Sequence, residues 1–430
     1  MIEMMKALFP EEGSEHNVER IISIANDAYK IADELYTAQD AENWGEGFVI
    51  PPEVVRSDEN LFKASMRNVE VMVNRRKHKM KRLRLSEERI IKTCRKDNPE
   101  ISRLILLANK GMPLSVRPGF VPSGRRPLPL LRKSFRSVKS AVNKLLYENF
   151  HQEGLAFLLT KNTVLSSIPD IHFSPLSWTS KQGKRQGRPI GDCSDGGKHS
   201  LNEPLNSKYT KEEADKLWGK IVHPSIQDVA KMADIFYAKE TKRNSAAKWT
   251  DLVMFKMDMK GAFTKIFFEA KDVKYLAMEM TDDIVILFFS GIFGWTGMPA
   301  AFQVINRAVV WELCHAIQGE VLMYSDDIIV VCMSIDLHKN MQTTKEICEG
   351  LLGPNAVETD KSNHGRVQTV IGYEINLYTR IVTISNRNIL KTLYGFMTVD
   401  LEKPVTVKLM QKLAPWATRY SNICTHMKPT

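Results

Sequence analysis

One short segment constrains the fold of this 430-residue chain more than any other, because two apolar runs in it meet at two adjacent acids. Val321–Met323 and Ile328–Val331 are the apolar runs, and Tyr324–Asp327 separates them. Such a pattern predicts two paired strands joined by a tight turn with the acids at its tip. Burying aspartates between strands is costly unless a cation compensates them. The segment therefore predicts a β-hairpin that presents Asp326 and Asp327 to a cation.

A second apolar strand also ends in an acid. Val253–Met257 leads into Asp258 and then into a turn of small residues around Gly261. Two divalent ions about 4 Å apart would compensate such acids and would serve in-line phosphoryl transfer. Two Mg²⁺ ions suit this role because Mg²⁺ takes few carboxylates and shares substrate phosphates; Mn²⁺ is a possible substitute. The alternative interpretation is that Asp326 and Asp327 form an ordinary polar turn.

The composition narrows the class of protein. The chain is 43% hydrophobic and 26% charged, so it can bury a sizeable core. Its net charge of +10 favours an anionic partner, either nucleic acid or an anionic membrane surface. The six cysteines form no CxxC pair, which argues against zinc modules and a disulfide framework. No signal pattern or membrane-length apolar run of about 18 residues is present, so we expect a cytoplasmic or nuclear protein without membrane segments.

Apolar periodicity predicts helices before the acidic segments. Asn17–Tyr36 and Glu59–Cys94 follow the helical rhythm, as does Arg132–Phe150. The second contains the basic run Arg75–Arg84, either a solvated helix face or a surface for phosphates. Gly111–Pro129 is rich in proline and glycine and should form an extended linker. From about residue 170 short apolar runs alternate with helices, which indicates an α+β protein.

The tetrapeptide Tyr324–Asp327 resembles the Tyr-x-Asp-Asp motif of reverse transcriptases, and Asp258 lies where their first catalytic aspartate lies. Four more segments resemble this family in chain order. They are Ser174–Asp192, similar to the fingers hairpin; Phe293–Gln303, similar to the segment that contacts template and nucleotide; Thr359–Lys361, similar to the last palm motif; and Ile371–Ile375, similar to the primer grip. The resemblance covers about residues 170–420 and implies a right-hand polymerase fold of the α+β class, with fingers, palm and partial thumb.

Local patterns up to about residue 170, and the resemblance after it, predict a division of the chain. Residues 1–110 would form a basic helical N-terminal region, 111–170 a Pro/Gly-rich linker and helix leading into the fingers, 171–385 the fingers and palm, and 386–430 the start of a thumb. Helical periodicity over Val405–Cys424 agrees with a thumb helix, whose Lys408, Lys412 and Arg419 would face the duplex. Because no RNase H, protease or integrase motif accompanies these segments, we expect a piece of a retroelement polyprotein or a truncated copy.

Residue roles follow from the same resemblance. Asp258, Asp326 and Asp327 would be the metal ligands and catalytic acids. Lys361 would help to protonate the departing pyrophosphate, with a surface lysine beside Asp360 as the alternative. Lys181 and Arg188 would bind the triphosphate from a hairpin. The alternative interpretation is that both are ordinary surface cations whose side chains are solvated. The remaining assignments are Phe263, Gly294, Gly297, Pro299, Gln303 and Tyr324 for substrate binding, and Gly372 and Tyr373 for the primer grip.

Phe263 and Phe293 bear on the kind of substrate. Phe263 lies five positions after Asp258 and matches the family's aromatic gate, whose ring fills the space of a ribose 2′-hydroxyl. This implies dNTPs as substrates, with a core phenylalanine as the alternative. Gly294 and Gly297 would let the backbone approach the nucleotide, and Pro299 would open a helix to Ile317. Phe293 departs from the glutamine of retroviral enzymes and points to a retrotransposon.

We therefore predict an RNA-directed DNA polymerase, of the long-terminal-repeat or tyrosine-recombinase (DIRS-like) retrotransposon type. It would extend a DNA or RNA primer with dNTPs on its own RNA. One alternative is an RNA-directed RNA polymerase, against which Phe263 and Arg188 argue. The other is a catalytically inactive or domesticated nucleic-acid-binding copy, against which the intact aspartates argue. The sequence leaves the oligomeric state and the template identity open.

Overall fold

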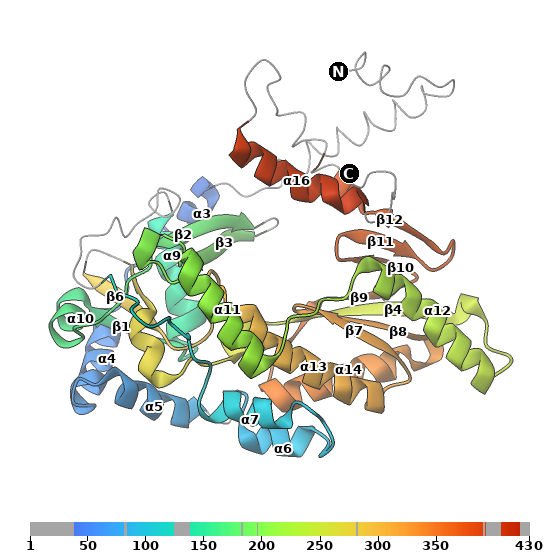
Figure 1. Ribbon diagram of the computed structural model, residues 1–430, viewed down its shortest axis with the longest axis horizontal. Helices are drawn as coiled ribbons and strands as arrows, with labels where there is room; N and C mark the ends of the chain where they lie inside the picture. Colours follow the sequence, from blue (N-terminus) through green and yellow to red (C-terminus); the bar gives the residue numbers. More distant parts are fainter. Residues whose placement is uncertain are drawn as a thin grey trace, which may run out of the picture. The chain divides into compact units, whose positions relative to one another are not determined.

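Helices and short sheets alternate in the computed structural model, which describes residues 38–80, 84–123, 138–181, 184–195, 197–280, 283–389, 392 and 406–421 (Figure 1). This arrangement confirms the predicted α+β class. The described residues fall into two compact units: the larger comprises 36–224 and 255–363, and the smaller contains 225–254 and 364–430. In the described residues no helix is long and apolar enough to cross a membrane.

A four-stranded sheet, almost entirely in the larger unit, carries the acids. Its strands are β7 (Gly319–Tyr324), β8 (Asp327–Met333), β4 (Leu252–Met259) and β9 (Val357–Gly365), in that order. β7 and β8 form an antiparallel hairpin whose last pair is Tyr324 with Asp327, as the two apolar runs predicted. Every residue of β8 after Asp327 is buried.

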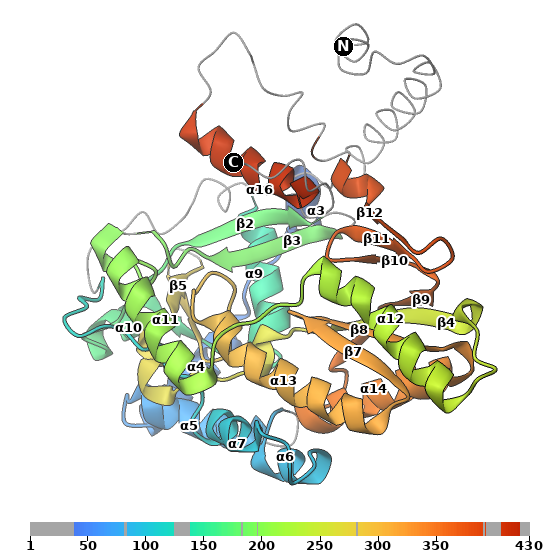
Figure 2. The same cartoon turned by 45° about the vertical axis from the view of Figure 1, so that its right-hand side comes forward.

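Helix α13 (Met298–Ala316) supports this sheet and packs against β7 and against α14 (Leu337–Leu352), as Figure 2 shows. Pro299 is at the start of α13, where the missing N–H costs no hydrogen bond, so the predicted helix from Pro299 is confirmed. Val304, Ile305 and most other residues of α13 are buried. The helix therefore forms part of the core beneath the hairpin.

Two further sheets lie in the larger unit. β2 (Leu176–Lys181) and β3 (Lys184–Gly191) pair as an antiparallel hairpin, as the resemblance implied. β1 (Ala156–Thr160), β6 (Ile284–Phe288) and β5 (Ala277–Glu279) form the other sheet in the order β1-β6-β5. The four residues after Ile284 in β6 are fully buried, as expected for the apolar run that begins there.

The N-terminal part is helical, but the prediction of one helix over Glu59–Cys94 is wrong. Met66 and Arg67 adopt left-handed backbone angles (φ of 56° and 54°) that end one helix, and Ser86 caps another by accepting a hydrogen bond from the Arg89 amide. The helices here are α3 (Ala38–Gly45), α4 (Pro52–Ala64), α5 (Val69–Met80), α6 (Glu87–Thr93) and α7 (Ile101–Asn109). The helix predicted over residues 17–36 lies outside the described residues.

The Pro/Gly-rich segment forms no helix over residues 111–123, but it is not extended throughout, because Ser115 and Gly119 have positive φ and Phe120 closes a turn by donating to the carbonyl oxygen of Arg117. However, Met112 and Leu114 are completely buried, and Met112 bridges to Phe268. The segment therefore packs into the larger unit instead of forming a free linker. The helix predicted from Arg132 is described as α9 (Lys139–Leu146), which continues into a π-helical turn over Tyr147–His151.

Short elements complete the larger unit. They are α10 (Lys161–Ser167), α11 (Pro204–Trp218) and the 3₁₀ turns Gly197–His199, Phe263–Lys265, Ala270–Tyr275 and Ser334–Asp336. α11 packs against α13, and α13 also contacts α7. Elements far apart in the sequence thus meet along α13.

The smaller unit contains α12 (Ile226–Arg243), the 3₁₀ turn Trp249–Asp251 and a sheet in the order β10-β11-β12. A capping box of Ser225 and Asp228 starts α12. The strands and the last helix are β10 (Val367–Val370), β11 (Tyr373–Asn376), β12 (Ile381–Ile384) and α16 (Val407–Ser421). The predicted C-terminal helix is thus confirmed over most of its length. The side chains of its cations Lys408, Lys412 and Arg419 lie outside the described residues.

Candidate active site

Asp258, in β4, and Asp326, in the turn between β7 and β8, meet at one end of the sheet. The backbone amide of Met259, next to Asp258, donates a 2.9 Å hydrogen bond to the carbonyl oxygen of Asp326. Ser325, at the tip of the hairpin, has a φ of 52°, a left-handed conformation that a serine rarely adopts. The tight turn leaves Asp326 exposed at the tip.

A cavity of about 550 Å³ lies over these two acids. Seven of the residues that the sequence assigned to catalysis or substrate binding line it: Arg188, Asp258, Phe263, Pro299, Gln303, Asp326 and Lys361. Tyr324 and Asp327 are in the adjoining hairpin. The structure therefore brings together Asp258 and Asp326, which are predicted to be catalytic, Arg188, which is predicted to bind the triphosphate, and Phe263, which is predicted to be the aromatic gate.

Lysines partner the acids. The Lys361 ammonium contacts Asp258 Oδ2, and Lys256 Nζ lies 3.6 Å from Asp327 Oδ1. Although the Asp326 side chain is exposed at the tip, the surrounding protein removes part of the water around its carboxylate and so raises its pKa, and the neighbouring charge of Asp258 raises it further. Burial also raises the pKa of Asp327, while Lys256 acts in the opposite direction. In both groups the loss of water around the carboxylate is the main cause of the raised pKa, and the neighbouring acids add to it.

The donor chemistry suits a hard cation. Asp258 and Asp326 both line the cavity, where Asp258 is also paired with Lys361, and Asp327 is paired with Lys256. No group of three Asp, Glu, His or Cys side chains in the described part of the chain is placed to hold a metal ion. Mg²⁺ takes few protein carboxylates and completes its ligands with substrate oxygens and water, so two acids are a donor set of the kind that it uses.

An aromatic cluster borders the acids. The Phe263 ring lies 5.2 Å from the ring of Phe293 and 5.8 Å from that of Phe302, measured between centroids. The guanidinium of Arg188 lies 4.9 Å from the centre of the Phe293 ring, at a distance typical of cation–π contacts. Phe293 is 40% exposed. Phe263 thus both packs against other rings and lines the cavity, so the two interpretations of this residue are compatible.

Two motif glycines have an explanation within the chain itself. Gly294 has a φ of 113°, and a Cβ placed on it would lie 1.8 Å from the carbonyl oxygen of Gly191. The Gly191 amide donates to the carbonyl oxygen of Phe293, which joins the β2–β3 hairpin to this loop. A Cβ on Gly297 would lie 2.2 Å from the Trp295 ring. Close packing of the chain on itself therefore requires glycine at both positions.

Sequence reasoning missed four residues of this region. Lys256 lies two positions before Asp258, and strand periodicity could have placed both side chains on one face. Asn202 donates to the carbonyl oxygen of Gly294 and accepts from the Thr296 amide. The other two are Asn306 and His223, which line the cavity. Nothing in the local sequence marked Asn202, Asn306 or His223, because their contacts join segments far apart in the chain.

The remaining predicted residues lie elsewhere. Lys181 ends β2 and pairs with Lys184 through the backbone, and its side chain lies outside the described residues. Gly372 and Tyr373 are in the smaller unit, at the turn between β10 and β11. Tyr373 is buried, and the carbonyl oxygen of Gly372 accepts hydrogen bonds from Ser385 and Asn388.

No protein-family model matches this sequence, and no curated protein sequence matches it. Solved structures do match. A foamy viral protease-reverse transcriptase in complex with double-stranded DNA has 15% identity and a TM-score of 0.45, over 79% of this chain and 54% of that chain. The foamy viral protease-reverse transcriptase in complex with an RNA/DNA hybrid has 15% identity and a TM-score of 0.44, over 79% and 41%. Telomerase from Candida albicans, in complex with a fragment of telomeric RNA, has 10% identity and a TM-score of 0.39, over 67% and 59%.

The chain spans about half the length of the foamy viral chains that it matches. At identities of 10–15% these similarities concern the fold and do not assign a role to any residue of this chain. This chain is thus a mixed helix-and-sheet protein with structural similarity to the polymerase folds of reverse transcriptases and telomerase.

Proposed function

We propose that this chain is a nucleic-acid polymerase of the reverse transcriptase kind, which extends a primer with dNTPs on an RNA template. The observation that supports it best is the meeting of Asp258, in β4, and Asp326, in the turn between β7 and β8, over one cavity that also contains Arg188 and Phe263. A polar turn without a function would need neither a second acid from another strand nor a cation and an aromatic ring facing both acids.

Each side chain has a distinct task in this proposal. Asp258 and Asp326 would hold Mg²⁺ ions, or Mn²⁺ in their place, which supply the Lewis acidity for in-line phosphoryl transfer. The planar fork of Arg188 would bind phosphate oxygens of the nucleotide. Lys361, beside Asp258, would donate a proton to the departing pyrophosphate. Phe263 would exclude a 2′-hydroxyl by occupying its space.

The proposal extends to the biological setting. The net charge of +10 supports a nucleic-acid partner. Phe293, which stacks on Arg188 where retroviral enzymes have a glutamine, supports a retrotransposon origin, and we propose that the template is the element's own RNA. The template-primer would be an RNA strand with an annealed DNA or RNA primer.

The decisive experiment is extension of a labelled DNA primer on an RNA template with Mg²⁺ and dNTPs. The wild-type chain should extend the primer, and Asp326→Asn should reduce the rate at least about a hundredfold, because the acid contributes several kcal/mol through the metal. Asp283→Asn is the matched control, since Asp283 is an exposed acid in the turn before β6. Extension by Asp326→Asn at the wild-type rate would refute the catalytic assignment.

Two other outcomes separate the alternatives. Incorporation of rNTPs in preference to dNTPs on the same primed template would favour an RNA-directed RNA polymerase. Tight binding of the template-primer without any extension would favour a nucleic-acid-binding protein that has lost catalysis.

A further inference from the structure

The loop Gly219–Pro224, which follows α11, exposes apolar side chains beside the candidate active site. Val222 is 71% exposed and Ile221 is 39% exposed. His223 lines the cavity that contains Asp258 and Asp326. Its ring lies 4.9 Å from the ring of Tyr324, the first residue of the acidic tetrapeptide. An exposed apolar and aromatic edge next to a polar cavity suggests a contact surface for a flat, partly apolar ligand.

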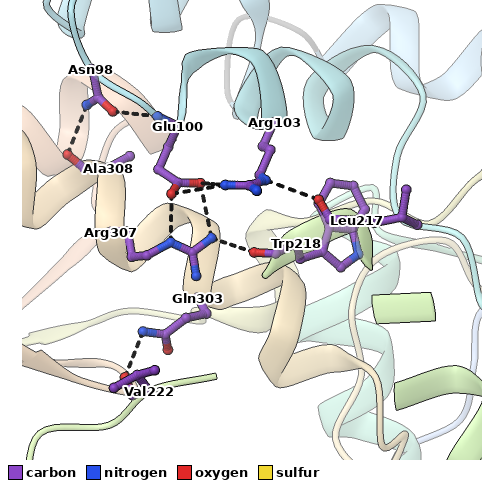
Figure 3. A network of polar contacts seen from close by, with 9 residues as sticks. All are labelled: Asn98, Glu100, Arg103, Leu217, Trp218, Val222, Gln303, Arg307 and Ala308. Atoms are coloured by element: carbon purple, nitrogen blue, oxygen red, sulfur yellow. Dashed lines mark hydrogen bonds and ion pairs between the residues drawn. The ribbon is translucent and has the colours of Figure 1, made fainter. Parts of the chain in front are cut away.

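The backbone of this loop is held at several points although its side chains are exposed. The side-chain amide of Gln303 donates a 3.1 Å hydrogen bond to the carbonyl oxygen of Val222. Just before the loop, Arg307 donates to the carbonyl oxygen of Trp218, and Arg103 donates to that of Leu217 at 3.2 Å. Figure 3 shows these donors converging on the end of α11 and on the loop. The loop is therefore fixed from the side of α13 and α7.

Glu100 joins the two arginines. Its carboxylate, whose side chain is 7% exposed, lies 2.7 and 3.1 Å from two nitrogens of Arg307 and 3.3 Å from Arg103 (Figure 3). Asn98 accepts a hydrogen bond from the Glu100 amide and donates to the carbonyl oxygen of Ala308 in α13. The segment before α7 is thus attached to α13 and, through it, to the loop.

We propose that Val222 and His223 form a nucleic-acid-contacting edge of the cavity, and that Glu100 is the residue that positions this edge. The proposal rests on the proposed polymerase function. The partner is the template-primer, whose bases offer apolar faces that stack on rings and pack on aliphatic side chains. Asp258 and Asp326 already place negative charge in the same cavity. The ring of His223 and the methyl groups of Val222 can contact bases there without adding a further charge.

The position of the loop depends on charge at Glu100. In Glu100→Gln the neutral amide keeps the shape of the side chain but loses the charge-assisted bonds to Arg307 and Arg103. Without these bonds, Arg307 and Arg103 are held less firmly in the orientation in which they donate to the carbonyl oxygens of Trp218 and Leu217. The loop should therefore open more often, although α11 and α13 keep their packing.

Hydrogen exchange of the full chain tests the positioning role without any activity measurement. Glu100→Gln should make the amides of residues 219–223 exchange at least about fivefold faster than in wild type, with β8 unchanged as evidence of an intact fold. Glu213→Gln is the matched control, because Glu213 pairs with Lys216 on the exposed face of α11. Arg307→Gln removes both the pair with Glu100 and the donor to the carbonyl oxygen of Trp218, so it should speed exchange of the loop at least as much as Glu100→Gln does. Unchanged exchange of the loop in Glu100→Gln would overturn the positioning role.

Binding of a fluorescent primed template, measured by anisotropy without nucleotides, tests the contact itself. His223→Ala should weaken binding about tenfold, in the range for one stacked base, whereas His223→Phe should stay within about threefold of wild type. Ile335→Ala removes an equally exposed apolar side chain from the turn after β8 and should have no effect. Wild-type affinity in His223→Ala would overturn the contact. Loss of binding in His223→Ala, in a chain that never extends primers, would instead reject the polymerase function and keep the contact.

Discussion

The side-chain amide of Asn306 donates a 2.8 Å hydrogen bond to the carbonyl oxygen of Ser325, at the tip of the hairpin that presents Asp326. Ser325 has a left-handed backbone (φ of 52°), which costs a serine roughly 1–2 kcal/mol. Asn306 lies in α13, is only 2% exposed and lines the cavity. Helix α13, which begins within the segment Phe293–Gln303, thereby holds the strained turn at Ser325.

Removing this bond should disturb the turn more than the fold. Asn306→Leu keeps the volume but donates nothing, so primer extension should slow about tenfold, the effect of one lost hydrogen bond and a relaxed turn. Ser325→Gly in the same chain should restore much of the rate, because glycine adopts positive φ without a steric penalty. If the double variant is as slow as Asn306→Leu, strain at Ser325 does not explain the role of Asn306. Single-turnover rates report the effect on the turn and melting temperatures report the effect on the fold, so both should be measured for each variant.

The crowded acids should make stability depend on pH. The pKa of Asp326 is raised above its ordinary value of 3.8, so the folded chain binds this proton more tightly than the unfolded chain does. The resulting loss of stability is complete above the raised pKa and disappears as the pH falls below about 3.8. Asp326→Asn should therefore raise the urea midpoint at pH 7 in metal-free buffer, and the gain should shrink towards pH 4. Asp283→Asn serves as the control, and an equal gain at both pH values would contradict the explanation.

Phe263 should set the choice of sugar. Phe263→Val removes most of the ring, so the preference for dNTPs over rNTPs, measured as the ratio of kcat/KM values, should fall about tenfold or more. Because the ring also packs against Phe293 and Phe302, the melting temperature should fall as well. Phe302→Val, at a neighbouring ring of the same cluster, is the control that separates lost packing from lost selection. Unchanged selection in Phe263→Val would leave Phe263 as a packing residue.

The stack of Arg188 on Phe293 should matter for nucleotide binding. A partly exposed cation–π contact contributes about 0.5–1 kcal/mol. Phe293→Leu should therefore raise the KM for dNTPs roughly two- to fivefold at an unchanged kcat, and Phe293→Tyr should stay close to wild type. Steady-state kinetics with one nucleotide and a saturating primed template measures this. A change in kcat alone would show that Phe293 acts on the chemistry and not by orienting Arg188.

Local patterns predicted the parts of the site that adjacent residues form. The hairpin around Asp326 and the strand that ends at Asp258 followed from apolar runs broken by polar turns, and the structure confirms both. The helix after Pro299 was equally readable, because proline at its first turn and apolar periodicity are local signals. In contrast, the apolar periodicity over Glu59–Cys94 did not indicate that the helix is interrupted at Met66 and Arg67, where φ is positive. Periodicity reports which face is apolar and does not report backbone angles at a single residue.

The sequence by itself determined the two strands and the acidic turn, because neighbouring residues suffice to specify them, and the hairpin of Arg188 followed from the resemblance. Tertiary structure alone decided which side chains meet. Lys361 contacts Asp258, 103 positions away, and Glu100 pairs with Arg307, 207 positions away. It also decided that Asp327 pairs with Lys256 and that His223 lies against Tyr324. Such partners depend on how helices and sheets pack across the core, and a one-dimensional pattern of residue types carries no information about that packing.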